Sequence, residues 1–124
     1  LGSSKDVNYG GDGEYRKGTN TYEFPKDQPA DSFALDGDWT IETQYATPQG
    51  DAGKINLDYR AAEVRIVVAG TGDIVVTRDD GSEETIAIDG TPRSYALVEQ
   101  DDIAEGTVTL DVPAGIEVYS FTFG

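Results

Sequence analysis

Cysteine, histidine and methionine are all absent from this chain of 124 residues. Without cysteine there is no disulfide, no redox motif and no thiolate metal site. Without histidine, serine–histidine–aspartate catalysis, imidazole-bound zinc and the usual general base at neutral pH are excluded. The lack of disulfides does not fix the compartment, because a domain with an adequate hydrophobic core needs none.

Positive charge is scarce. The chain has nine Lys and Arg residues and 24 Asp and Glu residues, which gives a formal net charge of −15. Such a chain is repelled by phosphate backbones and anionic membranes, so we expect no nucleic-acid partner. The simplest interpretation is that the charge keeps an extracellular or salt-adapted surface soluble, and cation binding is the alternative.

Long apolar runs are missing too. No stretch of 18 apolar residues and no signal peptide is present, so we expect no membrane insertion by this chain. Because it starts at Leu1 and not at Met, we expect a fragment whose targeting elements lie upstream.

Alternating apolar residues are what the sequence has in abundance, and this period of two is typical of β-strands. Turn-rich separators such as "TPQGDAG", "DDGS", "DGTP" and "PAG" divide eight to ten short strands. The pattern predicts an all-β, antiparallel β-sandwich, a jelly roll or a related Greek key. We expect a single domain over residues 1–124, with a loop-rich segment over 1–32 and the sandwich core over 33–124. The predicted inward groups are Trp39, Ile41, Thr43 and Tyr45; Ile55, Leu57 and Tyr59; Val64, Ile66 and Val68; and Val108, Leu110 and Val112.

Several local features carry their own predictions. "VVAGTGDIVVTRDDG" holds a G-x-G, but a phosphate loop needs a following helix, and β-branched residues follow instead. We therefore predict hairpin turns at residues 70–72 and 79–81. Short strands are expected near Gly13–Tyr15 and Thr19–Phe24, one helical turn in "EQDDIAEG", and a β-bulge between Val118 and Tyr119.

Metal binding and catalysis find little support. Asn8, Asp12 and Gly13 follow an EF-hand-like order, but Thr19 stands where a bidentate Glu is required. "DGDWTI" lacks the turn glycine, and "RDDGSEE" is better explained as a solvated hairpin tip. A structural calcium site built from distant loops stays open. Carboxylate pairs are too abundant to indicate a hydrolase, so we expect no enzyme, no catalytic residue and no assigned metal ligand.

Aromatic residues on neighbouring strands suggest a ligand site, because flat rings stack on sugars while polar side chains hold the hydroxyls. The competing interpretation places Trp39 in the core, since it alternates with Ile41. Tyrosines at strand ends are better candidates for exposed platforms. The candidate ligand-binding residues are Trp39, Gln44, Tyr45, Asn56, Tyr59 and Arg60.

Three motifs together, "DSFALDGDWTIETQYAT", "INLDYRAAEVRIVVAGTG" and "VYSFTFG", resemble the C-terminal domain of the DipZ-type thiol–disulfide interchange proteins of actinobacteria. The resemblance covers nearly the whole chain. It implies a jelly roll like a carbohydrate-binding module, outside the cytoplasmic membrane, behind a thioredoxin-like domain and an upstream membrane segment. The thioredoxin-like domain and its C-x-x-C are missing here, so we expect no oxidoreductase activity.

The expected function is therefore non-catalytic binding of carbohydrate or cell-envelope glycan beside the thioredoxin-like domain of the parent chain. The family motif includes Trp39, Gln44 and Tyr59. The alternative is a structural or protein-interaction domain that packs on the thioredoxin-like domain or docks its substrate proteins. Two or more exposed aromatic rings with a polar rim would favour glycan binding. A flat apolar patch near the N-terminus would favour docking.

Overall fold

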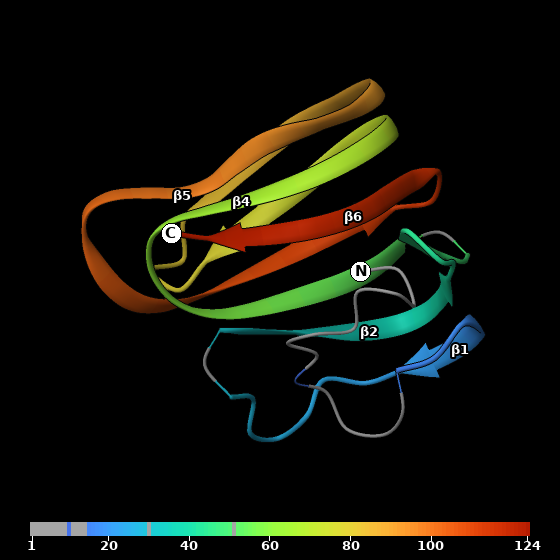
Figure 1. The fold of residues 1–124 in the computed structure, drawn as a ribbon, viewed down its shortest axis with the longest axis horizontal. Helices are drawn as coiled ribbons and strands as arrows, with labels where there is room; N and C mark the ends of the chain where they lie inside the picture. The colour runs from blue at the N-terminus through green and yellow to red at the C-terminus, as the bar shows by residue number, and fades with distance from the viewer. Residues whose placement is uncertain (1–9, 11–14, 30, 51) are drawn as a thin grey trace.

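The computed structural model describes residues 10, 15–29, 31–50 and 52–124 and is all-β (Figure 1). Its strands are β1 (Gly18–Tyr22), β2 (Ser32–Ile41), β3 (Ala46–Pro48), β4 (Ala52–Arg78), β5 (Glu83–Pro113) and β6 (Ile116–Phe123). Every pairing between them is antiparallel, and the described part of the chain contains no helix. The prediction of an all-β antiparallel fold is confirmed.

Strands β4 and β5 form one long antiparallel hairpin that wraps around the molecule. At the base of the hairpin residues 52–61 pair with 104–113, and toward its tip residues 63–77 pair with 83–99. The tip then folds back, so that residues 75–78 also pair with 108–111. A long hairpin wrapped in this way gives the two layers of a jelly-roll sandwich.

The remaining strands complete the two layers. In one layer, β2 pairs with β1 and with residues 54–58 of β4. In the other, β6 pairs with residues 64–70 of β4. Strand β3 connects the two, because it pairs with residues 39–41 of β2 and, at one residue, with β6. Because β4 and β5 run through both layers, the sheet curls round instead of splitting into separate strands (Figure 1).

Three local predictions were wrong for the same reason. Residues 70–72 form no turn but stay within β4, paired with 88–90 of β5. Gly70 and Gly72 have φ angles of +109° and +154°, so the strand bends there while its pairing continues. Residues 89–92, predicted as a separator between strands, and residues 99–106, predicted as a helical turn, likewise lie in β5. Turn residues can bend a wrapped hairpin without ending its strands, which is why eight to ten predicted strands merge into six.

Other local predictions are confirmed. The chain turns at residues 79–81, where the Gly81 N–H donates to the Arg78 carbonyl at 2.9 Å. A second turn follows Pro113. In β6 the register shifts so that Val67 faces Ser120 and Val68 faces Val118. Tyr119 is therefore the extra residue of the predicted β-bulge.

The N-terminal segment matches the prediction in part. The expected strand Thr19–Phe24 corresponds to β1, which begins at Gly18 and ends at Tyr22. Of the expected strand Gly13–Tyr15, residues 13 and 14 lie outside the described residues. Tyr15 is not in a strand, and its ring packs edge-on against Phe33 at 5.6 Å.

The core lies between the two layers and is built from the predicted alternation. Trp39 and Ile41 are fully buried, whereas Thr43 is exposed and Tyr45 half-exposed, because β2 ends at Ile41. The other predicted inward groups are buried: Ile55, Leu57 and Tyr59; Val64, Ile66 and Val68; and Val108, Leu110 and Val112. In the described chain, no helix long and apolar enough to cross a membrane is found.

Candidate functional site

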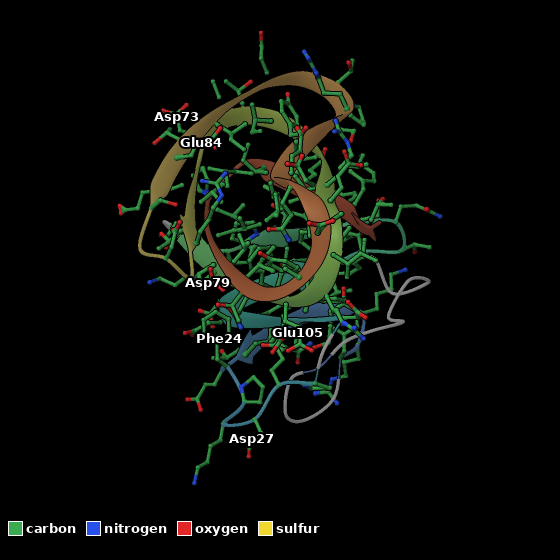
Figure 2. All side chains as sticks on the ribbon, turned by 90° about the vertical axis from the view of Figure 1, so that its left-hand side faces the viewer. Phe24, Asp27, Asp73, Asp79, Glu84 and Glu105 are labelled. Carbon is green, nitrogen blue, oxygen red and sulfur yellow. The ribbon has the colours of Figure 1, made fainter. Side chains whose placement is uncertain are left out.

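A hollow of about 440 Å³ opens at the end of the sandwich where the tip of the β4–β5 hairpin lies. This volume falls in the range of roughly 300–1,000 Å³ that is typical of ligand pockets. Figure 2 looks onto this end, where the side chains of Asp79, Glu84 and Glu105 lie around the curled ribbon. The residues that line the hollow are Tyr59, Arg78, Asp79, Asp80, Glu84, Ala96, Leu97, Val98, Glu99 and Gln100.

Arg78 crosses the hollow between the two layers. Its Nε and Nη2 donate to the Leu97 carbonyl at 3.3 and 3.0 Å, and Nη2 also donates to Glu84 Oε1 at 2.6 Å. Arg78 ends β4, while Leu97 lies in the opposite layer. The guanidinium therefore fixes the hairpin tip against the middle of β5 and leaves other N–H groups available to a ligand.

Tyr59 reaches the hollow from the first part of β4. It follows Ile55 and Leu57 in the inward phase of the strand, and only 6% of the residue is exposed. Within the described part of the chain its hydroxyl has no hydrogen-bond partner. Burial, followed by the negative charge of Asp79, raises the pKa of Tyr59. The hydroxyl therefore stays neutral and can both donate to and accept from a ligand.

The turn after β4 supplies carboxylates. The Ser82 N–H donates to Asp80 Oδ1 at 2.9 Å, and the hydrogen bonds from Ser82 lower the pKa of Asp80. Asp79 accepts a long hydrogen bond of 3.4 Å from the Thr107 N–H. The prediction of a solvated hairpin tip is confirmed, since residues 79–84 are exposed. The fold also brings Asp79, Asp80 and Glu84 to the rim of the hollow.

The hollow combines hydrogen-bonding groups with a smaller apolar surface. Carboxylates, a guanidinium and a phenol can hold several hydroxyl groups at once. The Gln100 Nε2 already donates to the Ala61 carbonyl at 2.9 Å, which leaves the Gln100 amide oxygen as an acceptor for a ligand. Ala96, Leu97 and Val98 offer apolar contact beside them. Among the described residues no group of three or more Asp and Glu side chains is placed to hold a metal ion. The EF-hand-like residues Asn8, Asp12 and Gly13 lie outside those residues.

Of the predicted ligand-binding residues, only Tyr59 lines the hollow. It is the one aromatic residue of the lining and is only 6% exposed, so the pair of exposed rings expected for a glycan site is not found in the hollow. Trp39 is fully buried, and its indole N–H donates to the Asp36 carbonyl at 3.0 Å. A ring without exposed surface cannot stack on a ligand, so this geometry corrects Trp39 from candidate platform to core residue.

The predicted polar residues lie elsewhere. The Asn56 amide donates to Gln28 Oε1 at 2.9 Å and accepts from the Thr109 hydroxyl at 3.1 Å, so both of its ends are engaged. Arg60 is exposed, and its main-chain N–H donates to Asp31 at 2.9 Å. These two residues therefore do not join Tyr59 in one site.

Gln44 and Tyr45 lie on the segment between β2 and β3. Gln44 is exposed, and the half-exposed Tyr45 ring lies 5.5 Å from that of Tyr119. A side-chain hydrogen bond with Glu117 is the main cause that raises the pKa of Tyr45. This tyrosine pair is a second aromatic surface, separate from the residues that line the hollow.

Sequence reasoning missed most of the hollow because its walls come from three distant stretches: Tyr59, residues 78–84 and residues 96–100. One signal was available. Arg78 is the only basic residue between positions 66 and 92, and it stands directly before the acids of the turn. A lone guanidinium at a strand end beside carboxylates is a natural bridge between layers.

Comparison with protein families matches all residues, 1–124, to the model described as "Thioredoxin like C-terminal domain". Two similar curated proteins are both called Protein DipZ, from Mycobacterium bovis (strain ATCC BAA-935 / AF2122/97) and Mycobacterium tuberculosis (strain CDC 1551 / Oshkosh). Each is 42% identical over 124 residues, which is 100% of this chain and 18% of the relative. The chain thus spans less than a fifth of the length of these relatives.

Two solved structures share the fold. A family two carbohydrate esterase from Cellvibrio japonicus aligns with a TM-score of 0.67 and 13% identity, over 73% of this chain and 30% of the esterase. A family two carbohydrate esterase from Clostridium thermocellum, in complex with cellohexaose, aligns with a TM-score of 0.62 and 14% identity, over 75% of this chain and 31% of the esterase. At these identities the likeness concerns the fold, and it agrees with the β-sandwich described above.

Proposed function

This chain belongs to the family of thioredoxin-like C-terminal domains and is a domain of the DipZ type, and from that premise we propose that it is a non-catalytic binding module for carbohydrate or cell-envelope glycan. The ligand binds in the hollow at the tip of the β4–β5 hairpin. In the parent protein the module lies outside the cytoplasmic membrane, tethered through an upstream membrane segment. There it holds the thioredoxin-like domain close to glycan-associated substrates.

The observation that carries this proposal is the hydroxyl of Tyr59. It belongs to a side chain that is 6% exposed, it lines the hollow, and the described residues offer it no hydrogen-bond partner. The oxygen is not one of the fully buried atoms of the described chain that lack a partner, so it is reachable from the hollow, and a ligand that enters there can supply a hydrogen bond in place of water. Sugar hydroxyls match this requirement and also suit the neighbouring Arg78, Gln100 and carboxylates.

The fold gives weaker support, by analogy. The esterase from Clostridium thermocellum, whose fold is similar, is known in complex with cellohexaose. A shared sandwich does not transfer a binding site, since sites are built from particular side chains on a common scaffold. The analogy therefore guides the choice of ligands to test and adds no residue to the site.

Docking of a protein partner is the competing function. Among the described residues Ile103 is the one exposed large apolar side chain, at 66%. It follows Asp101 and Asp102 in β5, and a single side chain falls far below the few hundred Å² of a typical docking patch. Observations on the described surface therefore favour the hollow over a flat interface.

A binding panel tests the proposal. The chain is titrated by calorimetry with neutral hexasaccharides, including cellohexaose and chitohexaose, and with soluble peptidoglycan fragments. Tyr59→Phe removes one hydroxyl from the hollow and should weaken binding about 3- to 10-fold, the equivalent of one lost hydrogen bond. Tyr45→Phe removes the same atom from the other aromatic surface and should leave affinity unchanged. Absence of binding across the panel, or loss of binding in Tyr45→Phe alone, would overturn the proposal.

A further inference from the structure

We infer that the hollow selects glycans that carry free amino groups, in which an ammonium replaces a hydroxyl or an acetamido group. This inference rests on the proposed function and specifies its ligand class. It follows from the balance of charge in the hollow, from the way its single guanidinium is used, and from the unpaired phenol at its wall.

The lining of the hollow is strongly acidic. The lining contains one arginine, Arg78, and four carboxylates: Asp79, Asp80, Glu84 and Glu99. Arg78 is already engaged, because its Nη2 lies 2.6 Å from Glu84 Oε1. Within the described chain no Lys or Arg forms an ion pair with the other three carboxylates. The hollow therefore presents uncompensated negative charge to any guest.

The carboxylates also keep free acceptor capacity. The contact from the Thr107 N–H to Asp79 is long, at 3.4 Å, and Asp80 Oδ1 accepts from the Ser82 N–H at 2.9 Å. Each carboxylate has about four lone-pair positions, so both can accept further hydrogen bonds. An ammonium donates up to three, and bonds between charged partners are the strong ones.

The wall around Tyr59 shows that this part of the hollow is tightly built. A methyl group placed on Gly106 would lie 2.5 Å from the Tyr59 hydroxyl oxygen and 2.9 Å from Asp79 Oδ2. Gly106 is not itself a lining residue, and its missing side chain leaves room for the Tyr59 hydroxyl and the Asp79 carboxylate to lie near each other. A phenol oxygen that accepts from an ammonium, beside a carboxylate that balances its charge, suits an amino sugar better than a neutral sugar.

Acidic glycans should be excluded by the same charges. A uronate or a phosphorylated sugar would bring a further negative charge beside Asp79, Asp80 and Glu99. The formal net charge of −15 opposes its approach even at longer range. Basic peptides also carry ammonium groups, but we favour the glycan because Arg78, Gln100 and Tyr59 provide partners for a polyhydroxylated guest.

The test uses ligands that share one backbone. The chain is titrated with a glucosamine hexamer and with the matching N-acetylglucosamine hexamer at pH 6, where amines are protonated. At low ionic strength we expect the amino form to bind about tenfold more tightly, which corresponds to ~1.4 kcal/mol. The preference should shrink in 0.5 M salt because salt screens exposed charges.

A variant pair with equal net charge locates the effect. Asp79→Asn should reduce the preference several-fold, whereas Asp89→Asn, at an exposed position in β5 outside the lining, should leave it unchanged. Thermal unfolding checks that both variants are folded. Equal weakening by both would assign the preference to overall charge and overturn the inference.

The other outcomes are equally informative. Equal affinity for the two hexamers overturns the amino-group preference and leaves the proposed glycan function standing. Binding of neither hexamer, together with no binding of any other glycan in the panel, overturns the proposed function itself. Tighter binding of a lysine hexapeptide than of the glucosamine hexamer would show that the hollow takes basic peptides, which also overturns the inference.

Discussion

Replacing Tyr59 with Phe should weaken ligand binding while leaving the protein as stable as before, or more stable. The substitution deletes one oxygen and keeps the ring that packs in the core. In most proteins a buried tyrosine hydroxyl is hydrogen-bonded, and its removal is destabilising. Here the hydroxyl has no partner among the described residues, so we expect its removal not to lower the free energy of unfolding and even to raise it.

The magnitude follows from burial. An unpaired buried hydroxyl costs about 1–3 kcal/mol by mutational measurements. The Tyr59 hydroxyl lines an open hollow, so water relieves part of that cost. We therefore expect Tyr59→Phe to raise the free energy of unfolding by 0 to about 1 kcal/mol. In a domain of this length the gain corresponds to an increase in Tm of at most roughly 3–5 °C.

Urea denaturation measures the effect directly. Trp39 is the only tryptophan and is fully buried, so its fluorescence reports global unfolding. Tyr45→Phe is the matched control, because it removes the same atom from a half-exposed tyrosine that does not line the hollow. A destabilisation of more than about 1 kcal/mol in Tyr59→Phe would show that the hydroxyl is paired in the native protein. That result would falsify the argument for a ligand partner.

Three further predictions concern stability. Gly70→Ala should lower the free energy of unfolding by roughly 2–4 kcal/mol, as measured by urea denaturation, because φ at Gly70 is +109° and the new methyl would lie 2.2 Å from the Gly115 carbonyl oxygen. A variant as stable as wild type would refute this close approach. Arg78→Gln should lower the free energy of unfolding by about 1.5–3 kcal/mol, since it removes charged hydrogen bonds between the two layers; a neutral result would show that the bridge contributes nothing. Burial raises the pKa of Asp58, and the negative charge of Glu105 is the second cause. Because the folded pKa lies above the unfolded value of 3.8, the stability that Asp58 contributes is present below pH 3.8 and is lost as the pH rises through the folded pKa. Asp58→Asn should therefore be more stable than wild type at pH 7 and equal to it near pH 3, as followed by unfolding across that range, and a difference that does not depend on pH would contradict this.

Alternation in the sequence was enough to predict the core. Residues such as Ile55, Leu57 and Leu110 are buried on the predicted side, because a strand sends successive side chains to opposite faces. The β-bulge at Tyr119 was also visible, since the inward phase changes there. These features depend on neighbours along the chain, so a single sequence contains them.

The wrapping of the hairpin was not visible in this way. Glycines at 70 and 72 are equally compatible with a tight turn and with a bent, continuous strand. Which of the two forms depends on distant pairing, such as that of Val76 with Leu110. The hollow is a product of the same long-range pairing, because it brings Tyr59 beside Arg78. For this reason local patterns identified Tyr59 as a candidate but grouped it with residues that do not line the hollow.

The continuous β4–β5 hairpin has a consequence for how the chain folds. Lys54 pairs with Asp111, so the base of the hairpin joins residues that are far apart in the sequence. Closing so long a loop is entropically costly before any contact compensates it, and such topologies reach the native state in milliseconds to seconds. Neither layer can melt by itself, because each shares its central strands with the other. Amide protons in both layers should therefore exchange with solvent through one common opening event.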